Sequence, residues 1–108
     1  MTQSSQNTIK VQTREAILRL LEVAQRDTGQ SRRCANFLLA WWNAESNGGF
    51  ALTDSWSCDL QIRKDMLTVF HYILVHNDYP TVFGLGDEFE ALVRLWRSSP
   101  KTPSKGRI

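Results

Sequence analysis

The sequence predicts an all-α fold: a compact four-helix single domain with an arm before it and a tail after it. Three observations predict this. Four segments repeat apolar residues at positions i, i+3, i+4 and i+7, the spacing that places side chains on one face of a helix. Residues that typically cap or stop helices separate these segments. The one apolar connector, residues 50–56, is too short and alternates too poorly to favour a β-strand.

The first helix is expected to follow a polar arm. Residues 1–11 are rich in Gln, Ser, Thr and Asn and show no apolar period, which predicts a disordered N-terminal arm. Thr13 is the expected N-cap, and Glu15 would lie in the first turn, where a carboxylate meets the positive end of the helix dipole. The helix should end near residues 27–29. Its predicted apolar face consists of Ile17, Leu20, Leu21 and Ala24.

The second helix carries two adjacent tryptophans, and we expect it to be the central helix. Thr28 or Ser31 can cap it. Leu39 and Trp42 widen its apolar arc beyond what a surface helix needs, so it should pack on two neighbours. The main apolar face consists of Cys34, Phe37, Leu38 and Trp41.

A glycine stop and a connector lead into the third helix. Gly48 or Gly49 can supply the backbone conformation that commonly ends a helix. We interpret residues 50–56 as a connector with one helical turn, and Ser57 can cap a third helix over residues 59–76. One of its faces consists of Ile62, Met66, Val69, Phe70 and Ile73. A second stripe, at intervals of seven, consists of Leu60, Leu67 and Leu74.

The last helix begins after a proline-containing turn. Residues 77–80 should end the third helix, and residues 82–86 are expected to be an apolar loop. Asp87 is the expected N-cap of a fourth helix whose apolar face consists of Phe89, Leu92, Val93 and Trp96. The predicted division is an arm over residues 1–11, a helical domain over 12–97 and a basic flexible tail over 98–108. Both a bundle and an irregular helical array stay open.

Composition excludes few functions. The chain has 108 residues, 42% of them hydrophobic and 22% charged, and its net charge of +2 is too small to indicate a nucleic-acid or membrane partner by itself. Charge is nevertheless uneven, because the first half is mildly basic, the second is acidic and the tail is basic. The absence of a signal-peptide pattern and of a long apolar run predicts a cytoplasmic protein that does not enter the membrane.

Several short motifs along the chain carry a family resemblance. They are Arg26-Asp27-Thr28-Gly29-Gln30, Phe37-Leu38-Leu39-Ala40-Trp41-Trp42-Asn43-Ala44, Gly48-Gly49-Phe50, Leu52-Thr53-Asp54 with Trp56, Asp65-Met66 with Thr68-Val69-Phe70, Tyr79-Pro80, and Phe89-Glu90-Ala91-Leu92-Val93 with Trp96. Over roughly residues 16–97 the sequence resembles a family of short uncharacterised bacterial proteins that are often encoded on integrative or plasmid-borne elements. The resemblance implies a bacterial, cytoplasmic, single-domain protein, and it transfers no catalytic residue.

Two pairs of residues are candidates for binding a partner. Trp42 and Trp56 could form the floor of a protein-binding groove, since aromatic side chains are enriched in interface hot spots. The alternative is that the tryptophans belong to a large aromatic core. Arg32 and Arg33 stand where positive charge opposes the helix dipole, so a partner's anion could compensate them. The alternative for this pair is an internal salt bridge to Glu22, Asp27 or an acidic residue of the third helix.

The sequence shows no catalytic, metal or cofactor site. Cys34 and Cys58 lack paired zinc-ligand spacing and are expected to be small buried thiols. His71 and His76 are not placed i, i+4 for one metal. We therefore expect a non-enzymatic protein-interaction module, an adaptor or an inhibitor. The alternative is an accessory nucleic-acid-binding protein that uses its basic helix N-terminus and tail, and self-association as a homodimer is also open.

Overall fold

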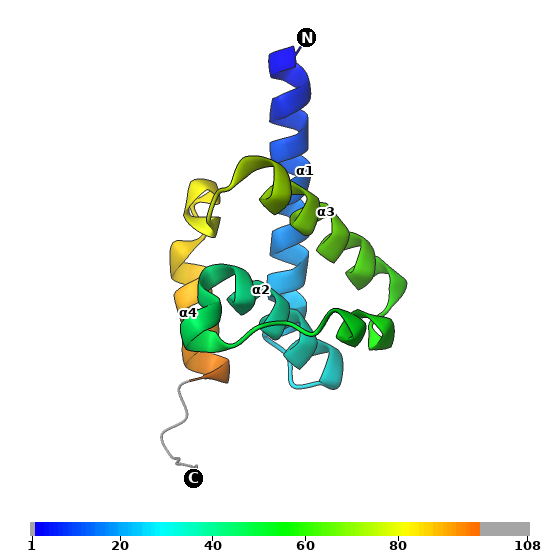
Figure 1. The fold of residues 1–108 in the computed structure, drawn as a ribbon, viewed down its shortest axis with the longest axis vertical. Helices are drawn as coiled ribbons and strands as arrows, with labels where there is room; N and C mark the ends of the chain where they lie inside the picture. Colours follow the sequence, from blue (N-terminus) through cyan, green and yellow to red (C-terminus); the bar gives the residue numbers. More distant parts are fainter. Residues whose placement is uncertain (1, 98–108) are drawn as a thin grey trace.

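The computed structural model describes the backbone of residues 2–97 and the side chains of residues 8–97. Within that part of the chain it contains four α-helices, two 3₁₀-helices and no β-strand (Figure 1). The predicted all-α class is confirmed. The elements are α1 (Thr2–Ala24), α2 (Gly29–Asn47), η1 (Leu52–Ser57), α3 (Leu60–His76), η2 (Pro80–Phe83) and α4 (Gly86–Trp96).

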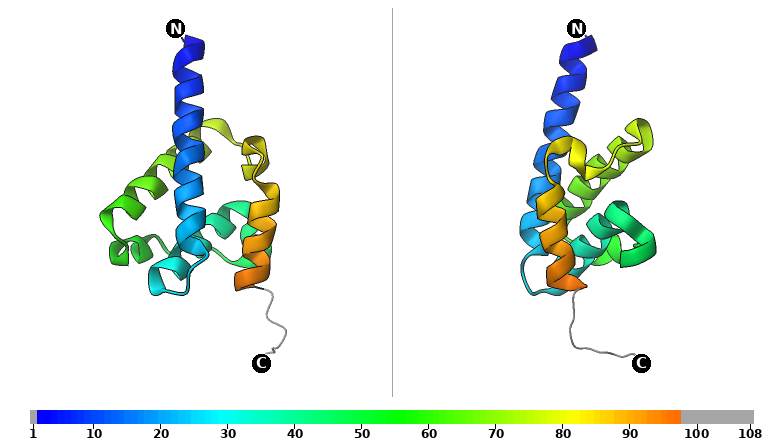
Figure 2. Two further views of the ribbon diagram at one scale, coloured as in Figure 1. Left: turned by 180° about the vertical axis from the view of Figure 1, so that it is seen from behind. Right: turned by 90° about the vertical axis from the view of Figure 1, so that its left-hand side faces the viewer.

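The helices form an irregular array rather than an up-and-down bundle. The long helix α1 packs against α2, α3 and α4. Figures 1 and 2 show α4 beside α1 and running in the same direction, whereas α2 and α3 cross α1 obliquely. As expected from its wide apolar arc, α2 packs on two helices, α1 and α4. The helix with three helical neighbours is nevertheless α1, which therefore holds the central position expected for α2.

Helix α1 begins well before its expected N-cap. Its first residue is Thr2, so the structure replaces the predicted disordered arm of residues 1–11 with helix from Thr2 onward. Thr13 is in the middle of the helix rather than at its start. Its side chain is buried, and its hydroxyl donates a hydrogen bond to the Ile9 carbonyl at 2.8 Å. No glycine or proline precedes Gly29, and extending a nucleated helix costs far less than starting one. The polar turns therefore continue the helix, which projects beyond the other elements (Figure 2).

The boundaries of α2 follow the local sequence. Thr28 is the N-cap, and its hydroxyl accepts a hydrogen bond from the Ser31 amide at 3.0 Å. The helix kinks at Asn43, whose backbone is extended and whose side-chain oxygen caps the last turn at the Ser46 amide. Gly48 then ends the helix with φ of 89°, as its sequence position predicted.

The later boundaries differ slightly from expectation. The connector after α2 contains η1, which at six residues is about two 3₁₀ turns rather than the one turn expected. Helix α3 follows with Asp59 rather than Ser57 as its N-cap, because Ser57 is the last residue of η1. The expected apolar loop contains η2, and α4 starts at Gly86 with Leu85 in the N-cap position, so Asp87 lies in its first turn. The basic tail predicted over residues 98–108 lies outside the described residues.

The hydrophobic core lies where α1 meets the other three helices. Each α-helix contributes at least one side chain with almost no exposed surface, including Leu20, Leu38, Val69 and Phe89. Cys34 and Cys58 are buried in the same cluster as free thiols. Since this core connects α2, α3 and α4 to α1, the four helices pack around one shared core.

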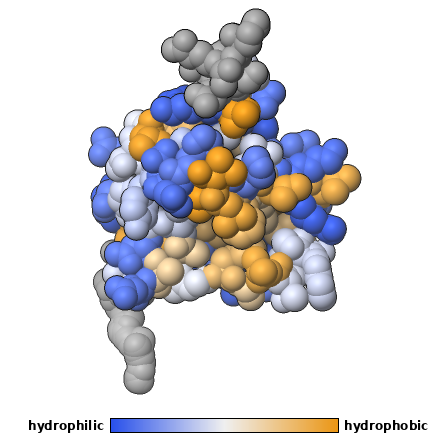
Figure 3. Space-filling model, turned by 45° about the horizontal axis from the view of Figure 1, so that its top comes forward, coloured by the Kyte–Doolittle hydropathy of each residue, from blue (hydrophilic) through white to orange (hydrophobic). Residues whose placement is uncertain are grey.

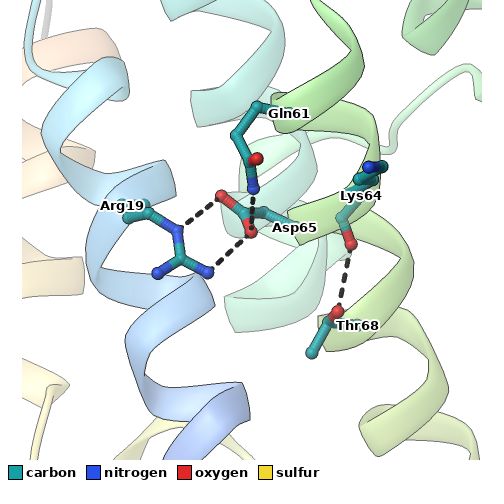
Figure 4. Close-up of polar contacts among 5 residues, drawn as sticks. All are labelled: Arg19, Gln61, Lys64, Asp65 and Thr68. Carbon is teal, nitrogen blue, oxygen red and sulfur yellow. Dashed lines mark hydrogen bonds and ion pairs between the residues drawn. The ribbon is translucent and has the colours of Figure 1, made fainter.

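A buried carboxylate fixes α3 on α1. Figure 4 shows Arg19 reaching from α1 to Asp65 on α3, with Gln61 on the other side of the carboxylate. The guanidinium donates from Nε at 3.0 Å and from Nη2 at 2.9 Å, and the Gln61 amide donates at 3.2 Å. Asp65 is 3% exposed, so these three bonds replace its hydration. The hydrogen bond to Asp65 raises the pKa of Arg19.

Candidate protein-interaction groove

An open groove separates α2 from α3. Both helices pack on α1, but they have little backbone contact with each other. Between them lies a cavity of about 740 Å³, lined by residues from both helices, from η1 and from the turn after α3. The groove thus results from the oblique crossing of α2 and α3 over their common support.

The floor of the groove is aromatic and aliphatic. Phe37 and Trp41 come from α2, and Met66 and Ile73 come from α3. Phe37 also packs edge-on against Phe50, with ring centroids 5.4 Å apart. These side chains are buried or half-buried, so the floor continues directly into the core.

The rim of the groove is apolar and exposed. Leu52 from η1, Leu67 and Phe70 from α3, and Tyr79 after α3 all line the groove and remain open to solvent. Figure 3 shows apolar side chains gathered in the middle of one face of the molecule. A contiguous apolar surface of this kind usually marks an interaction site.

The two ends of the groove carry opposite charges. At one end Arg63 is held by hydrogen bonds from Nε to the Cys58 carbonyl at 2.8 Å and from Nη2 to the Trp56 carbonyl at 3.1 Å. At the other end the Asp78 carboxylate accepts a hydrogen bond from the Tyr72 hydroxyl at 2.9 Å. The rise of α3 separates the two ends by roughly 20 Å. Burial, followed by the hydrogen bond to Asp78, raises the pKa of Tyr72 to about 12.

The second stripe predicted on the third helix lies next to this rim. Leu60, Leu67 and Leu74 are all exposed, on the side of α3 turned away from the core. Leu67 belongs to the groove itself. The stripe therefore enlarges the apolar rim rather than adding to the core.

The tryptophans expected to form a groove do not lie together in it. Trp42 packs on Phe89 of α4, with ring centroids 5.6 Å apart, and Trp56 in η1 is 73% exposed. Neither lines the groove, which contains Trp41 instead. Adjacent helical residues point about 100° apart, so turning Trp41 toward the groove directs Trp42 toward α4. The structure therefore does not bring Trp42 and Trp56 together as the floor of a groove, and Trp41 lies in the floor instead.

The two arginines of α2 lie outside the groove. Arg32 is exposed, whereas Arg33 is half-buried and folds back so that its Nη1 lies 3.1 Å from where a β-carbon on Gly29 would stand. Neither forms an ion pair within residues 8–97, so the expected internal salt bridge is not formed there. Arg26 pairs instead with Glu22, at 3.5 Å.

Metal-binding groups, reactive thiols and membrane-spanning helices are further features that would indicate a function in the described part of the chain. No three or more histidine, cysteine or acidic side chains within it are grouped to hold a metal ion. Burial raises the pKa of the Cys34 thiol to about 12 and also raises the pKa of Cys58. Both thiols therefore stay protonated near neutral pH. In the same part of the chain, no helix combines the length and the apolar character needed to cross a membrane.

Comparison with known proteins places this groove within a family domain. The model of a family of unknown function (DUF7673) matches residues 14–97 of the chain. The chain belongs to this family. The DUF7673 region includes α2, α3, α4 and most of the packed part of α1, so every residue of the groove lies inside it. Searches of curated proteins and of solved structures found no match.

Proposed function

We propose that this protein is a non-enzymatic protein-interaction module, an adaptor or an inhibitor, that binds an amphipathic helix between α2 and α3. The observation that carries the proposal is the groove itself, with a buried aromatic floor and an exposed apolar rim. Binding of an amphipathic helix in an apolar groove is a recurring mode of peptide recognition. A helix could bury the rim without any rearrangement of the floor.

The charges at the groove ends favour one orientation of the bound helix. A helix carries partial positive charge at its N-terminus and partial negative charge at its C-terminus. Its N-terminus would therefore lie near Asp78 and its C-terminus near Arg63. Because α3 runs from Arg63 toward Asp78, the bound helix would run antiparallel to α3. The spacing of the two ends suits a helix of roughly four turns.

An accessory nucleic-acid-binding role is the second candidate. Its support is that Arg32 and Arg33 find no ion-pair partner within residues 8–97, so an anion could compensate them. The pairing of Arg26 with Glu22 removes a third basic residue from that surface.

The family resemblance also leads us to expect a bacterial, cytoplasmic protein encoded on a mobile element.

A capture experiment with matched variants tests the proposed function. The tagged full-length protein would be recovered from its source cells at low and high salt, with and without nuclease. We expect a protein partner that resists both treatments, is lost with Leu67→Glu and is retained with Leu18→Glu. Both leucines are exposed, but only Leu67 lies in the groove. Binding that disappeared with nuclease or salt, and that depended on Arg32 instead, would favour the nucleic-acid role.

A further inference from the structure

We propose that the helix filling the groove is α3 of a second copy of this chain, so that two copies form a two-fold dimer through antiparallel α3 helices. This inference rests on the proposed function and names the partner of the same groove. Three features of α3 support it: its apolar spacing, the self-complementary order of its residues and the size of its exposed surface.

The exposed face of α3 has the spacing of a helix-helix seam. Leu60, Leu67 and Leu74 lie seven residues apart, and Phe70 stands three after Leu67 and four before Leu74. Alternating intervals of three and four keep one apolar line facing a second helix. All four side chains are exposed in the single copy. The seam therefore lacks a partner helix in the part of the chain that the structure describes.

The order of residues along this seam is self-complementary. A two-fold axis requires each residue to meet its counterpart in reverse order. When the axis passes midway between Phe70 and His71, Leu67 lies opposite Leu74 of the second copy. The same register brings Arg63 near the end of the second copy's α3, just before the turn that carries Asp78. In this register Leu67 and Leu74 pair across the axis, the two Phe70 side chains lie on either side of it, and Leu60 falls beyond the end of the second α3. The orientation is the antiparallel one that the groove charges favour.

The available area suits a stable dimer. Six rim and seam side chains are between 42% and 72% exposed: Leu52, Leu60, Leu67, Phe70, Leu74 and Tyr79. With typical areas for such side chains they expose on the order of 700 Å² per copy. A standard stable interface buries about 800 Å² per partner. Complete burial of these six side chains would therefore supply most of that value.

Paired variants test both the dimer and its register. Sedimentation equilibrium of the full-length protein should give the mass of a dimer. Leu67→Lys and Leu74→Glu should each raise the dimer dissociation constant about 100-fold or more, because each removes two apolar contacts across the axis. An equal mixture of the two variants should dimerise again. In the mixed dimer one Lys-Glu contact forms and one Leu-Leu contact is restored. Leu18→Lys, on exposed α1 surface, is the control and should remain dimeric.

Cysteine cross-linking gives a second measurement that does not depend on charged substitutions. The double variant Leu67→Cys with Leu74→Cys should form a disulfide-linked dimer under mild oxidation, whereas Leu18→Cys should not. The two native thiols are buried and should not compete. Circular dichroism would establish that each variant is helical before its cross-linking is compared with that of the control.

Several outcomes would overturn the inference. A monomer at all concentrations, a dimer unaffected by both leucine variants, or a mixture that stays monomeric would each contradict it. If the protein were monomeric but still captured another protein through Leu67, the second-copy inference would fail and the proposed function would stand. If it were monomeric and Leu67→Glu changed nothing in the capture experiment, both would fail.

Discussion

Individual tryptophans differ in what they contact, although two of them are adjacent in the sequence. The Trp41 indole donates a hydrogen bond to the Asp78 carbonyl at 2.9 Å and meets Phe89 edge-on, with ring centroids 5.9 Å apart. Trp41 therefore belongs both to the groove floor and to the core. Trp56, in contrast, presents most of its surface to solvent. Residue type alone does not distinguish these roles.

Truncation of these two tryptophans should have very different effects. Trp41→Ala should lower the free energy of unfolding by about 3 kcal/mol, because it removes core packing and a hydrogen bond. Trp56→Ala should change the free energy by no more than about 0.5 kcal/mol, as is usual for an exposed residue. Urea denaturation followed by circular dichroism measures both. Equal losses for the two variants would contradict the observed exposure of η1.

Tyr72 should make the protein sensitive to alkaline pH. Burial and the hydrogen bond to Asp78 raise its pKa from 10.0 to about 12, so the folded state favours the protonated phenol. This contribution to stability is complete below pH 10 and is lost as pH rises toward 12. Denaturation midpoints measured across this range should fall less steeply for Tyr72→Phe than for the unmodified protein. Parallel curves would rule out the contribution of Tyr72.

At the scale of the elements, the end of α2 is a short segment that also anchors α4. Asn43 interrupts the helix and caps its last turn, and Gly48 ends it with a positive φ. The Asn47 carbonyl then accepts a hydrogen bond from Arg97 at 2.9 Å. The Arg97 side chain is half-buried, and this burial lowers its pKa. Local helix termination thus sets where α4 can dock.

The two consecutive glycines after α2 provide a matched test. Gly48→Ala should destabilise the protein by roughly 1–3 kcal/mol, because a backbone with φ of 89° and ψ of 162° is essentially restricted to glycine. Gly49 does not have a positive φ, and a β-carbon added to it would meet no atom within 4 Å, so Gly49→Ala should be close to neutral. Urea midpoints of the two variants give the comparison. An equal cost would mean that loss of glycine flexibility, not the backbone angle, is responsible.

At the scale of the whole molecule, the groove exists because one helix supports two others that diverge. Helix α1 contributes the shared packing surface, and the Arg19–Asp65 pair fixes α3 on it. The floor of the groove is continuous with the core, so the binding surface and the stability of the fold depend on the same packing.

Thiol labelling should report the opening of the whole core. Cys34 has no exposed surface, and burial raises its pKa to about 12, so a thiol reagent should modify it only after the protein unfolds. The labelling rate should increase with urea in parallel with the unfolded fraction. The same peptide labelled in full denaturant provides the control. Fast labelling of Cys34 in the native protein would show local opening of α2.

The candidate site was predictable only in part. The spacing of Leu60, Leu67 and Leu74 was visible in the sequence, but periodicity does not show whether a stripe faces the core or solvent. The choice between Trp41 and Trp42 as the groove residue depends on how α2 is rotated against α4. The ends of the groove gave no signal, because Arg63 bonds to backbone carbonyls and the bond from Tyr72 to Asp78 spans the end of α3, where helical spacing no longer applies.

Sequence by itself determined the helical class, the approximate positions of the four helices and the stop at Gly48, because these depend on local periodicity and capping. Tertiary structure decided the irregular array and the groove. These features depend on which faces meet in space: α2 and α3 both pack on α1 with little contact between them, and the α3 surface left over is apolar. Local patterns carry no information about that crossing geometry.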